Sequence, residues 1–160
     1  MLLIILIKSK KKEKKHLFTI PYNTYNHSIK KTATIGYIKC VIRKKWLLLT
    51  PEEWVRQNYL QYLIADLKYP IAAIAVEKKL KIFEKNKRFD IVVYDATVKP
   101  LLLIECKSQQ IKLDITVLQQ IHNYYTVVQC RYMIITNGDE NLGWDMELNM
   151  AMEQVPKYMP

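Results

Sequence analysis

Cysteine, glycine and histidine are scarce in this sequence, and their scarcity excludes several classes of protein. Cys40, Cys106 and Cys130 lie far apart and form no CxxC pair, which argues against a zinc site and against a disulfide framework. The three His residues form no ligand pattern. Only three Gly residues occur, and none belongs to a Gly-x-x-x-x-Gly-Lys-Ser/Thr phosphate loop, so these 160 residues contain no NTP-driven motor. We expect a reducing, cytoplasmic location.

Long hydrophobic runs are also missing. The apolar run at the N-terminus ends at Ile7, too short to cross a bilayer, and a block of lysines follows it. No membrane association is therefore expected. Residues 1–35 are interpreted as an N-terminal strand with a basic segment, and residues 36–160 as the main domain. The lysine block is either a solvated loop or an arm that contacts phosphate.

Acidic residues are outnumbered, with 15 Asp and Glu against 25 Lys and Arg and a formal net charge of +10. Part of the excess is local, because residues 1–15 hold six Lys and one Glu. The rest of the chain still carries a surplus of five positive charges. This balance favours a polyanionic partner such as DNA. Tyr22, Tyr25 and Tyr37 either line a bound strand or simply fill β-structure.

The hydrophobic pattern predicts an α/β sandwich with one mixed β-sheet flanked by helices. Residues 17–49 have the pattern of short strands with turns. Thr50, Pro51 and Glu53 mark the start of a helix that continues to about Leu67. The predicted elements that follow are a strand over residues 74–80, a hairpin formed by residues 91–94 and 101–104, a helix over residues 115–128, and a strand before the Asn137-Gly138 turn.

Charged residues stand at the ends of the two most apolar strands. The turn residues "DATVKP" place the midpoint of the hairpin near Thr97 and Val98, so Asp90 is expected opposite Glu105. Lys107 is expected on the same face as Glu105, because side chains alternate along a strand. Two facing carboxylates repel, and a divalent cation between them makes the arrangement favourable. Mg²⁺ prefers such oxygen ligands, and the lysine can stabilise charge that develops on a phosphate.

The Asp-x(n)-Glu-x-Lys arrangement resembles that of the PD-(D/E)XK nuclease superfamily. The segments "IRKKWLLLTPEEWVRQNYLQYLI", "RFDIVVYD" and "LLLIECK" are similar to small proteins related to the N-terminal nuclease domain of type I restriction enzyme R subunits. The similarity runs from about Ile42 to Gly138. It implies a restriction-endonuclease-like sandwich fold and a metal-dependent DNA nuclease that uses Mg²⁺, with Mn²⁺ as a substitute. A homodimer is one assembly to consider, because cutting both strands of a duplex needs two sites.

The resemblance also implies roles for individual residues. Asp90 and Glu105 would be the metal ligands and Lys107 the catalytic lysine, while Phe89 stands where the superfamily usually has proline. Two residues of "QIHNY" match a Gln-x-x-x-Tyr motif that would support the site: Gln120 and Tyr124. Three further carboxylates are candidate acidic residues of the site: Glu52 or Glu53 on the first helix, and Glu77 before the hairpin. Of these, Glu52 and Glu77 are further candidate metal ligands.

Each assignment has a simpler alternative. Asp90, Glu105 and Lys107 would also suit a surface ion-pair cluster. The residues of the Gln-x-x-x-Tyr match would suit a polar edge and a core aromatic. Glu53 would also suit a capping box, and Glu52 would suit the positive end of the helix dipole. Glu77 would also suit a strand position that faces solvent. The alternative function is a degenerate nuclease fold that binds nucleic acid or a protein without cutting.

Overall fold

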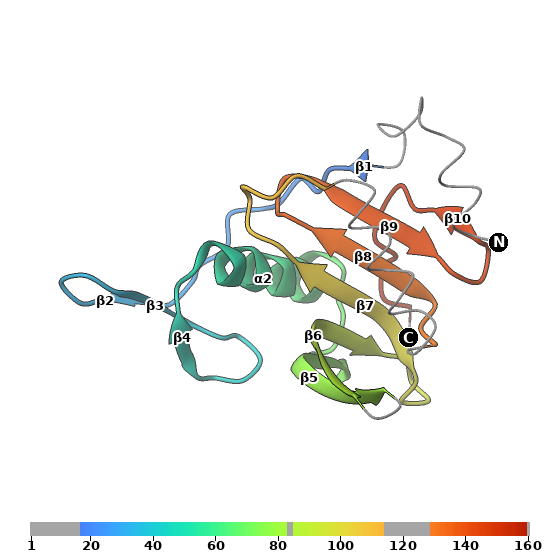
Figure 1. Ribbon diagram of the computed structural model, residues 1–160, viewed down its shortest axis with the longest axis horizontal. Helices are drawn as coiled ribbons and strands as arrows, with labels where there is room; N and C mark the ends of the chain where they lie inside the picture. Colours follow the sequence, from blue (N-terminus) through green and yellow to red (C-terminus); the bar gives the residue numbers. More distant parts are fainter. Residues whose placement is uncertain (1–16, 83–84, 114–128, 160) are drawn as a thin grey trace.

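The computed structural model describes residues 17–82, 85–113 and 129–159, without the side chains of residues 79–87 (Figure 1). The N-terminal strand predicted before residue 8 lies outside the described residues. So does the helix predicted over residues 115–128. Within the described part of the chain, no helix is long and apolar enough to cross a membrane.

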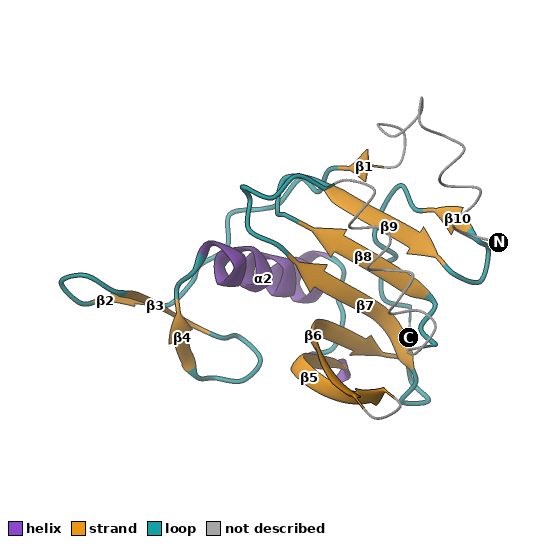
Figure 2. Ribbon diagram, viewed as in Figure 1, coloured by secondary structure: helices purple, strands orange, loops and turns teal. Residues whose placement is uncertain are grey.

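A seven-stranded mixed sheet forms the centre of the molecule, as the sequence predicted (Figure 2). Its main path runs β1-β9-β8-β7-β6-β5, and β10 also pairs with β9. β7 and β8 are parallel, and the other neighbours are antiparallel. The strands are β1 (Leu17–Phe18), β5 (Ile74–Ile82), β6 (Lys85–Tyr94), β7 (Pro100–Cys106), β8 (Tyr132–Thr136), β9 (Asn141–Asp145) and β10 (Met150–Ala151). The chain is an α/β protein with a restriction-endonuclease-like fold.

β6 and β7 form the predicted antiparallel hairpin. Ile91 pairs with Ile104, and the register continues in step as far as Val93, where it shifts by one residue. The Asp95 carboxylate closes the turn by accepting hydrogen bonds from the backbone N–H of Thr97 at 2.8 Å and from that of Lys99 at 2.9 Å. Asp side chains commonly stabilise turns in this way. The turn chemistry therefore sets the register that places the charged residues at the open end.

Helix α2 (Pro51–Gln61) covers one face of the sheet (Figure 2). Thr50 is its N-cap, and the Thr50 hydroxyl accepts a hydrogen bond from the backbone N–H of Glu53 at 3.0 Å, as predicted. A π-helical turn (Tyr62–Asp66) and a 3-10 turn (Ile71–Ala73) carry the chain to β5. The core on this face includes Val55, Tyr59, Leu60, Leu63, Ile91, Val93, Leu102 and Ile104.

A second cluster lies on the other face of the sheet. It contains Phe89, Val92, Leu103, Leu113, Cys130, Met133, Ile135 and Leu142. Residues 91–93 of β6 therefore alternate between the two clusters, as a strand that is covered on both faces requires. Both faces of the sheet therefore carry buried apolar side chains.

The C-terminal part, whose structure the sequence left open, completes the sheet. β8 and β9 are joined through residues 137–140, and Gly138 in this turn has a φ of +93°, a conformation that favours glycine. β10 then returns along β9. The Asn137-Gly138 turn was predicted from the sequence and is confirmed.

Three short strands form a separate antiparallel sheet in the order β2-β3-β4: β2 (Ile29–Lys31), β3 (Gly36–Lys39) and β4 (Trp46–Leu48). This small sheet, named the arm below, extends away from the central sheet at one end of the molecule (Figure 1). β2 and β3 pair across the boundary proposed at residue 35. β4 leads directly into the N-cap of α2.

Candidate active site

The open end of the β6–β7 hairpin brings Asp90 and Glu105 together. Ile91 pairs with Ile104, and the same register, continued by one residue, places Asp90 beside Glu105. Asp90 is 9% exposed, and the Glu105 side chain is 13% exposed. The Asp90 Oδ2 atom accepts a hydrogen bond of 2.7 Å from the backbone N–H of Cys106, which ties the end of one strand to the other. The charge of Asp90 acts on Glu105, so the two nearly buried carboxyl groups lie in one region, while their role as a pair of metal ligands stays a prediction.

The regular alternation of β6 is interrupted at Asp90. Phe89 belongs to the cluster on the far face, Ile91 belongs to the cluster under α2, and Asp90 also turns towards α2. Glu77 of β5 lies between Val76, which pairs with Ile91, and Lys78, which pairs with Phe89, and it has a φ of +50°. This left-handed conformation costs a non-glycine residue about 1–2 kcal/mol. The irregularity turns the carboxylate of Asp90 out of the expected alternation and towards the helix.

Lys107 follows β7 directly and is fixed at two points. Its backbone N–H donates to the carbonyl oxygen of Thr136 at 2.8 Å, so the end of the neighbouring parallel strand holds its main chain. Its Nζ atom donates to Oε1 of Glu105 at 2.9 Å. Asp90, Glu105 and Lys107 therefore occupy one region at the ends of adjacent strands.

Arg56 of α2 joins the acidic residues of this region, and the sequence analysis did not identify it. Arg56 is 4% exposed, and its guanidinium binds Asp90 at 2.7 Å. It also contacts three other carboxylates: Glu52 at 3.1 Å, Glu53, and Glu77 at 3.7 Å. The position of Arg56, three residues before Tyr59 and four before Leu60, was the available signal, because that spacing places it on the buried face of the helix.

Glu53 and Glu77 belong to the supporting layer of this cluster. The Glu53 carboxylate binds Arg56 and accepts from Nε2 of Gln57 at 2.8 Å. The reciprocal half of a capping box is absent, because the backbone N–H of Thr50 donates to the carbonyl of Leu48. Glu77 binds Arg43 and lies 3.5 Å from Arg88. Glu77 therefore faces guanidinium groups, whereas the side chain of Glu52 is 47% exposed.

The pKa of the Glu105 carboxyl group is raised above its usual value. Burial raises its pKa, and the neighbouring charge of Asp90 raises it further, while Lys107 opposes both effects. Burial likewise raises the pKa of Glu53, against the influence of Gln57 and Arg56. Among the side chains that the structure describes, five carboxylates are gathered around four cations in this cluster, which leaves one negative charge in excess. The region is therefore suited to accept a cation.

A comparison of the sequence with models of protein families identifies the family of this chain. The family model described as "Type I restriction enzyme R protein N terminus (HSDR_N)" matches residues 51–159, more than half of the chain. The chain belongs to this family. No curated protein matches the chain. The resemblance inferred from the sequence is confirmed, and the HSDR_N match includes the cluster from Glu52 to Lys107 but not the arm.

Some predicted residues of the HSDR_N domain cannot be placed. Gln120 and Tyr124 lie outside the described residues, and their role stays a prediction. Among the described residues, no group of three or more His, Cys, Asp or Glu side chains is arranged to hold a metal ion. The role of Asp90, Glu105, Glu77 and Glu52 as metal ligands therefore stays a prediction, and Glu52 has the most exposed side chain of the four.

Proposed function

We propose that the chain is a metal-dependent nuclease that hydrolyses phosphodiester bonds in DNA. The observation that carries this proposal is the meeting of Asp90, Glu105 and Lys107 at the ends of adjacent strands, with an excess of negative charge around them. Two adjacent carboxylates with a nearby ammonium group are the groups expected at a site that holds a divalent cation and acts on phosphate. Membership of the HSDR_N family supports the same chemistry.

The donor set fits Mg²⁺. Asp90 and Glu105 provide hard oxygen ligands, and Mg²⁺ typically binds through one or two carboxylates while it keeps several waters. A carboxylate offers about four lone-pair sites. The hydrogen bonds from Arg56 and from Cys106 use two sites on Asp90, and Lys107 uses one on Glu105. A bound Mg²⁺ or Mn²⁺ ion would polarise a phosphoryl oxygen and lower the pKa of its water.

The residues of the chain have distinct roles in this proposal. Asp90 and Glu105 hold the cation, and Arg56 fixes the orientation of the Asp90 carboxylate from the helix. Lys107 orients the attacking water and stabilises the negative charge that develops on the phosphate. Its ammonium is 2.9 Å from Glu105, so metal and lysine would act on neighbouring oxygens. Gln120 and Tyr124 are proposed to support the site.

A binding module without nuclease activity is the second candidate, and Arg56 is the observation that favours it. The guanidinium already neutralises Asp90, and Glu77 faces guanidinium groups, so part of the acidic cluster is satisfied without a metal. Such internal pairing is what a retired metal site would acquire. The two candidates differ in whether metal supports cleavage.

Cleavage assays distinguish them. Plasmid DNA and single-stranded DNA are incubated with the protein in Mg²⁺, in Mn²⁺ and in chelator. We expect cleavage that needs metal, and loss of cleavage in Asp90→Ala, Glu105→Ala and Lys107→Ala. Lys107→Ala should retain metal binding and lose the chemical step. The matched controls Glu153→Gln and Lys99→Ala remove exposed charges elsewhere and should cut normally. DNA binding without cleavage in any metal would favour the binding module.

A further inference from the structure

The arm presents an outward face made of basic and aromatic side chains. Strand alternation and the β2–β3–β4 register place five residues on this face: Lys30, Tyr37, Lys39, Trp46 and Leu48. Lys30 is paired with Tyr37, and Lys39 with Trp46. The Nζ atom of Lys30 lies 4.5 Å from the ring centroid of Trp46 and 5.4 Å from that of Tyr37. The face therefore combines cations with aromatic rings.

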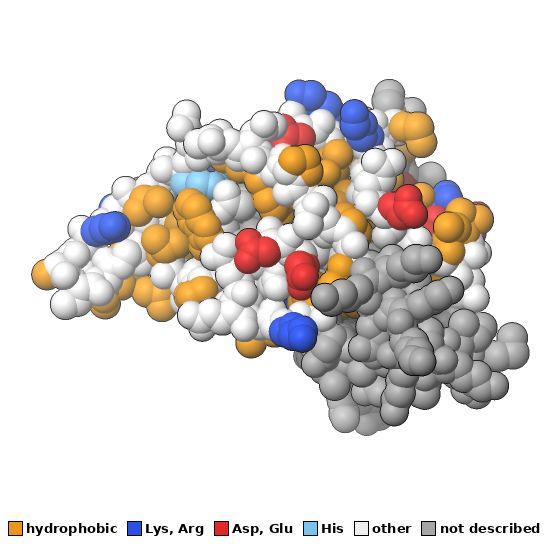
Figure 3. All heavy atoms as spheres, turned by 90° about the horizontal axis from the view of Figure 1, so that it is seen from above, with side chains coloured by type: hydrophobic (Ala, Val, Ile, Leu, Met, Phe, Trp, Pro, Cys, Tyr) orange, Lys and Arg blue, Asp and Glu red, His pale blue; other side chains and the backbone are white. Residues whose placement is uncertain are grey.

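Large apolar side chains remain exposed on this small sheet. The exposed fractions are 41% for Trp46, 54% for Leu48, 42% for Ile29 and 42% for Ile35. Figure 3 shows hydrophobic side chains over the arm, together with a basic one. On the opposite side of the arm, Ile38 is fully buried and Leu47 packs against the main core, whereas Ile29, which pairs with Ile38, is exposed. The exposed face is thus free to bind a partner while the buried side fixes the arm to the domain.

The charge of the arm identifies the kind of partner. Residues 28–48 contain six basic residues and no acidic residue. Five of the six are exposed lysines: Lys30, Lys31, Lys39, Lys44 and Lys45. None of these lysines forms an ion pair with a described residue. A polyanion is therefore the complementary partner, and aromatic rings beside the cations suit bases that can stack on them.

The arm is connected to the candidate active site through the loop between β3 and β4. Arg43 of this loop binds Glu77, and the backbone N–H of Val41 donates to Oε1 of Gln57 at 3.1 Å. Gln57 in turn binds Glu53 of the acidic cluster. A strand held by the arm would therefore lie beside the element that carries this cluster. Other tyrosines are already engaged, because Tyr22 packs against Tyr59 and Tyr25 binds Asp66.

We propose that the outward face of the arm binds single-stranded DNA next to the cleavage site, with phosphates on Lys30 and Lys39 and bases stacked on Tyr37 and Trp46. The assignment rests on the proposed function for its substrate and goes beyond it in naming the strand-binding surface. The arm lies before the segment that matches the HSDR_N family, so its role comes from these side chains alone.

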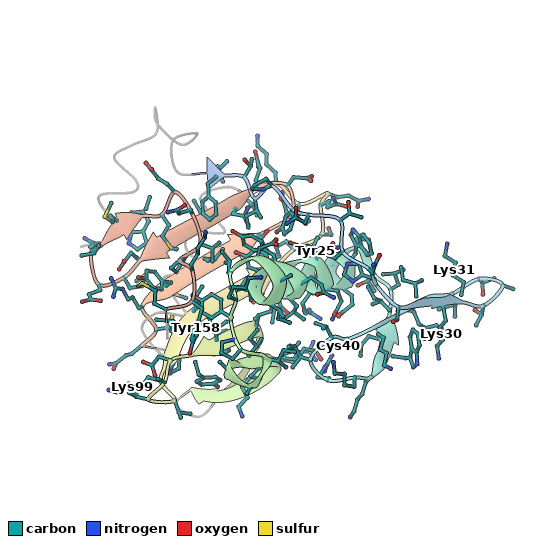
Figure 4. All side chains as sticks on the ribbon, turned by 180° about the vertical axis from the view of Figure 1, so that it is seen from behind. Tyr25, Lys30, Lys31, Cys40, Lys99 and Tyr158 are labelled. Atoms are coloured by element: carbon teal, nitrogen blue, oxygen red, sulfur yellow. The ribbon has the colours of Figure 1, made fainter. Side chains whose placement is uncertain are left out.

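Binding of a labelled single-stranded oligonucleotide in chelator tests the phosphate contacts without any cleavage. Lys30→Ala/Lys39→Ala should lower the slope of log K against log salt by about 1.4, since each phosphate contact on a single strand contributes about 0.7. The matched control is Lys99→Ala/Lys157→Ala, which removes two exposed positive charges from outside the arm. Lys99 lies at the other end of the molecule from Lys30 (Figure 4). Equal slopes in the two double variants would overturn the proposal.

The aromatic contact has its own test. Trp46→Leu should weaken single-strand binding roughly 5- to 150-fold, the effect of removing one stacked base, and Trp46→Phe should restore most of it. Circular dichroism checks that each variant stays folded. If the arm lysines are needed for duplex binding and Trp46→Leu has no effect on single-strand binding, bases do not stack on Trp46 and the proposal is wrong. A stable dimer formed through this face, measured by sedimentation, would also contradict the proposal, because the partner chain would cover the face. Metal-dependent cleavage with unchanged binding in the arm variants would remove the arm proposal and leave the nuclease proposal intact.

Discussion

Replacing Arg56 with methionine is the sharpest test of how the acidic cluster is held together. Arg56→Met keeps most of the side-chain length and removes the guanidinium that contacts Asp90 at 2.7 Å and Glu52 at 3.1 Å. Breaking a buried ion pair by removing one partner costs about 3–5 kcal/mol. The remaining partners reduce the effect, because Asp90 keeps the N–H of Cys106 and Glu53 keeps Gln57. We expect a loss of about 3 kcal/mol.

Urea unfolding at pH 7 in chelator measures this loss directly. In thermal unfolding, a loss of 3 kcal/mol corresponds to a fall in Tm of about 6–12 °C for a domain of this size. The control is Arg131→Met, because Arg131 is 42% exposed and pairs with Asp145 at 3.5 Å and Glu147 at 3.1 Å. Pairs that are this exposed contribute within about 1 kcal/mol. An Arg56→Met variant that loses no more than this control would refute the reasoning.

The pH dependence of the stability loss in Arg56→Met shows whether the loss comes from charge or from packing. Without Arg56 the pKa of Glu53, already raised by burial, should rise further. A carboxyl group with a raised pKa in the folded state favours folding below its unfolded pKa of about 4.3 and loses that contribution as pH rises. The deficit of Arg56→Met should therefore be largest near pH 7 and smaller near pH 4. An equal deficit at both values would assign the loss to packing.

Three further predictions follow from the same structure. Glu105→Gln should raise the urea midpoint in chelator at pH 7, because burial and Asp90 raise the pKa of Glu105, and the gain should vanish below about pH 4.3. Asp90→Ala should instead lower stability by about 3 kcal/mol, because it leaves Arg56 without its 2.7 Å partner; an unchanged midpoint would contradict this. Gly138→Ala should cost about 1–2 kcal/mol in the same assay, because φ is +93° and the added Cβ would lie 3.1 Å from Val55.

The features predicted correctly from the sequence depend on local chemistry. The turn residues around Thr97 predicted the hairpin register, and the N-cap Thr50 and the Asn137-Gly138 turn were also recognised. Such signals lie within a few residues of the structure that they determine. The expectation that Asp90 and Glu105 lie close together followed from the turn residues around Thr97.

The features that were missed depend on tertiary packing. Arg56 and Asp90 are 34 positions apart, and their contact exists because α2 packs across the sheet. The sequence analysis treated the carboxylate pair as repelling and considered a metal ion or an ion-pair cluster with Lys107, whereas Arg56 relieves part of the repulsion. The positive φ of Glu77 and the projecting arm could not be predicted from the hydrophobic periodicity, because neither feature depends on a hydrophobic repeat.

The pairing of β1 with β9 has a consequence for the way this protein is made. Asn141 of β9 binds the carbonyl oxygen of Phe18, a contact that spans 123 positions of sequence. Domains begin to fold during synthesis, from the N-terminal side, at about 5–20 residues per second. The backbone of residues 17–18 therefore waits several seconds without its partner strand, until residue 142 leaves the ribosome. During that interval the backbone N–H and C=O groups of residues 17–18 have no β9 strand to pair with, so β1 is added to the sheet late.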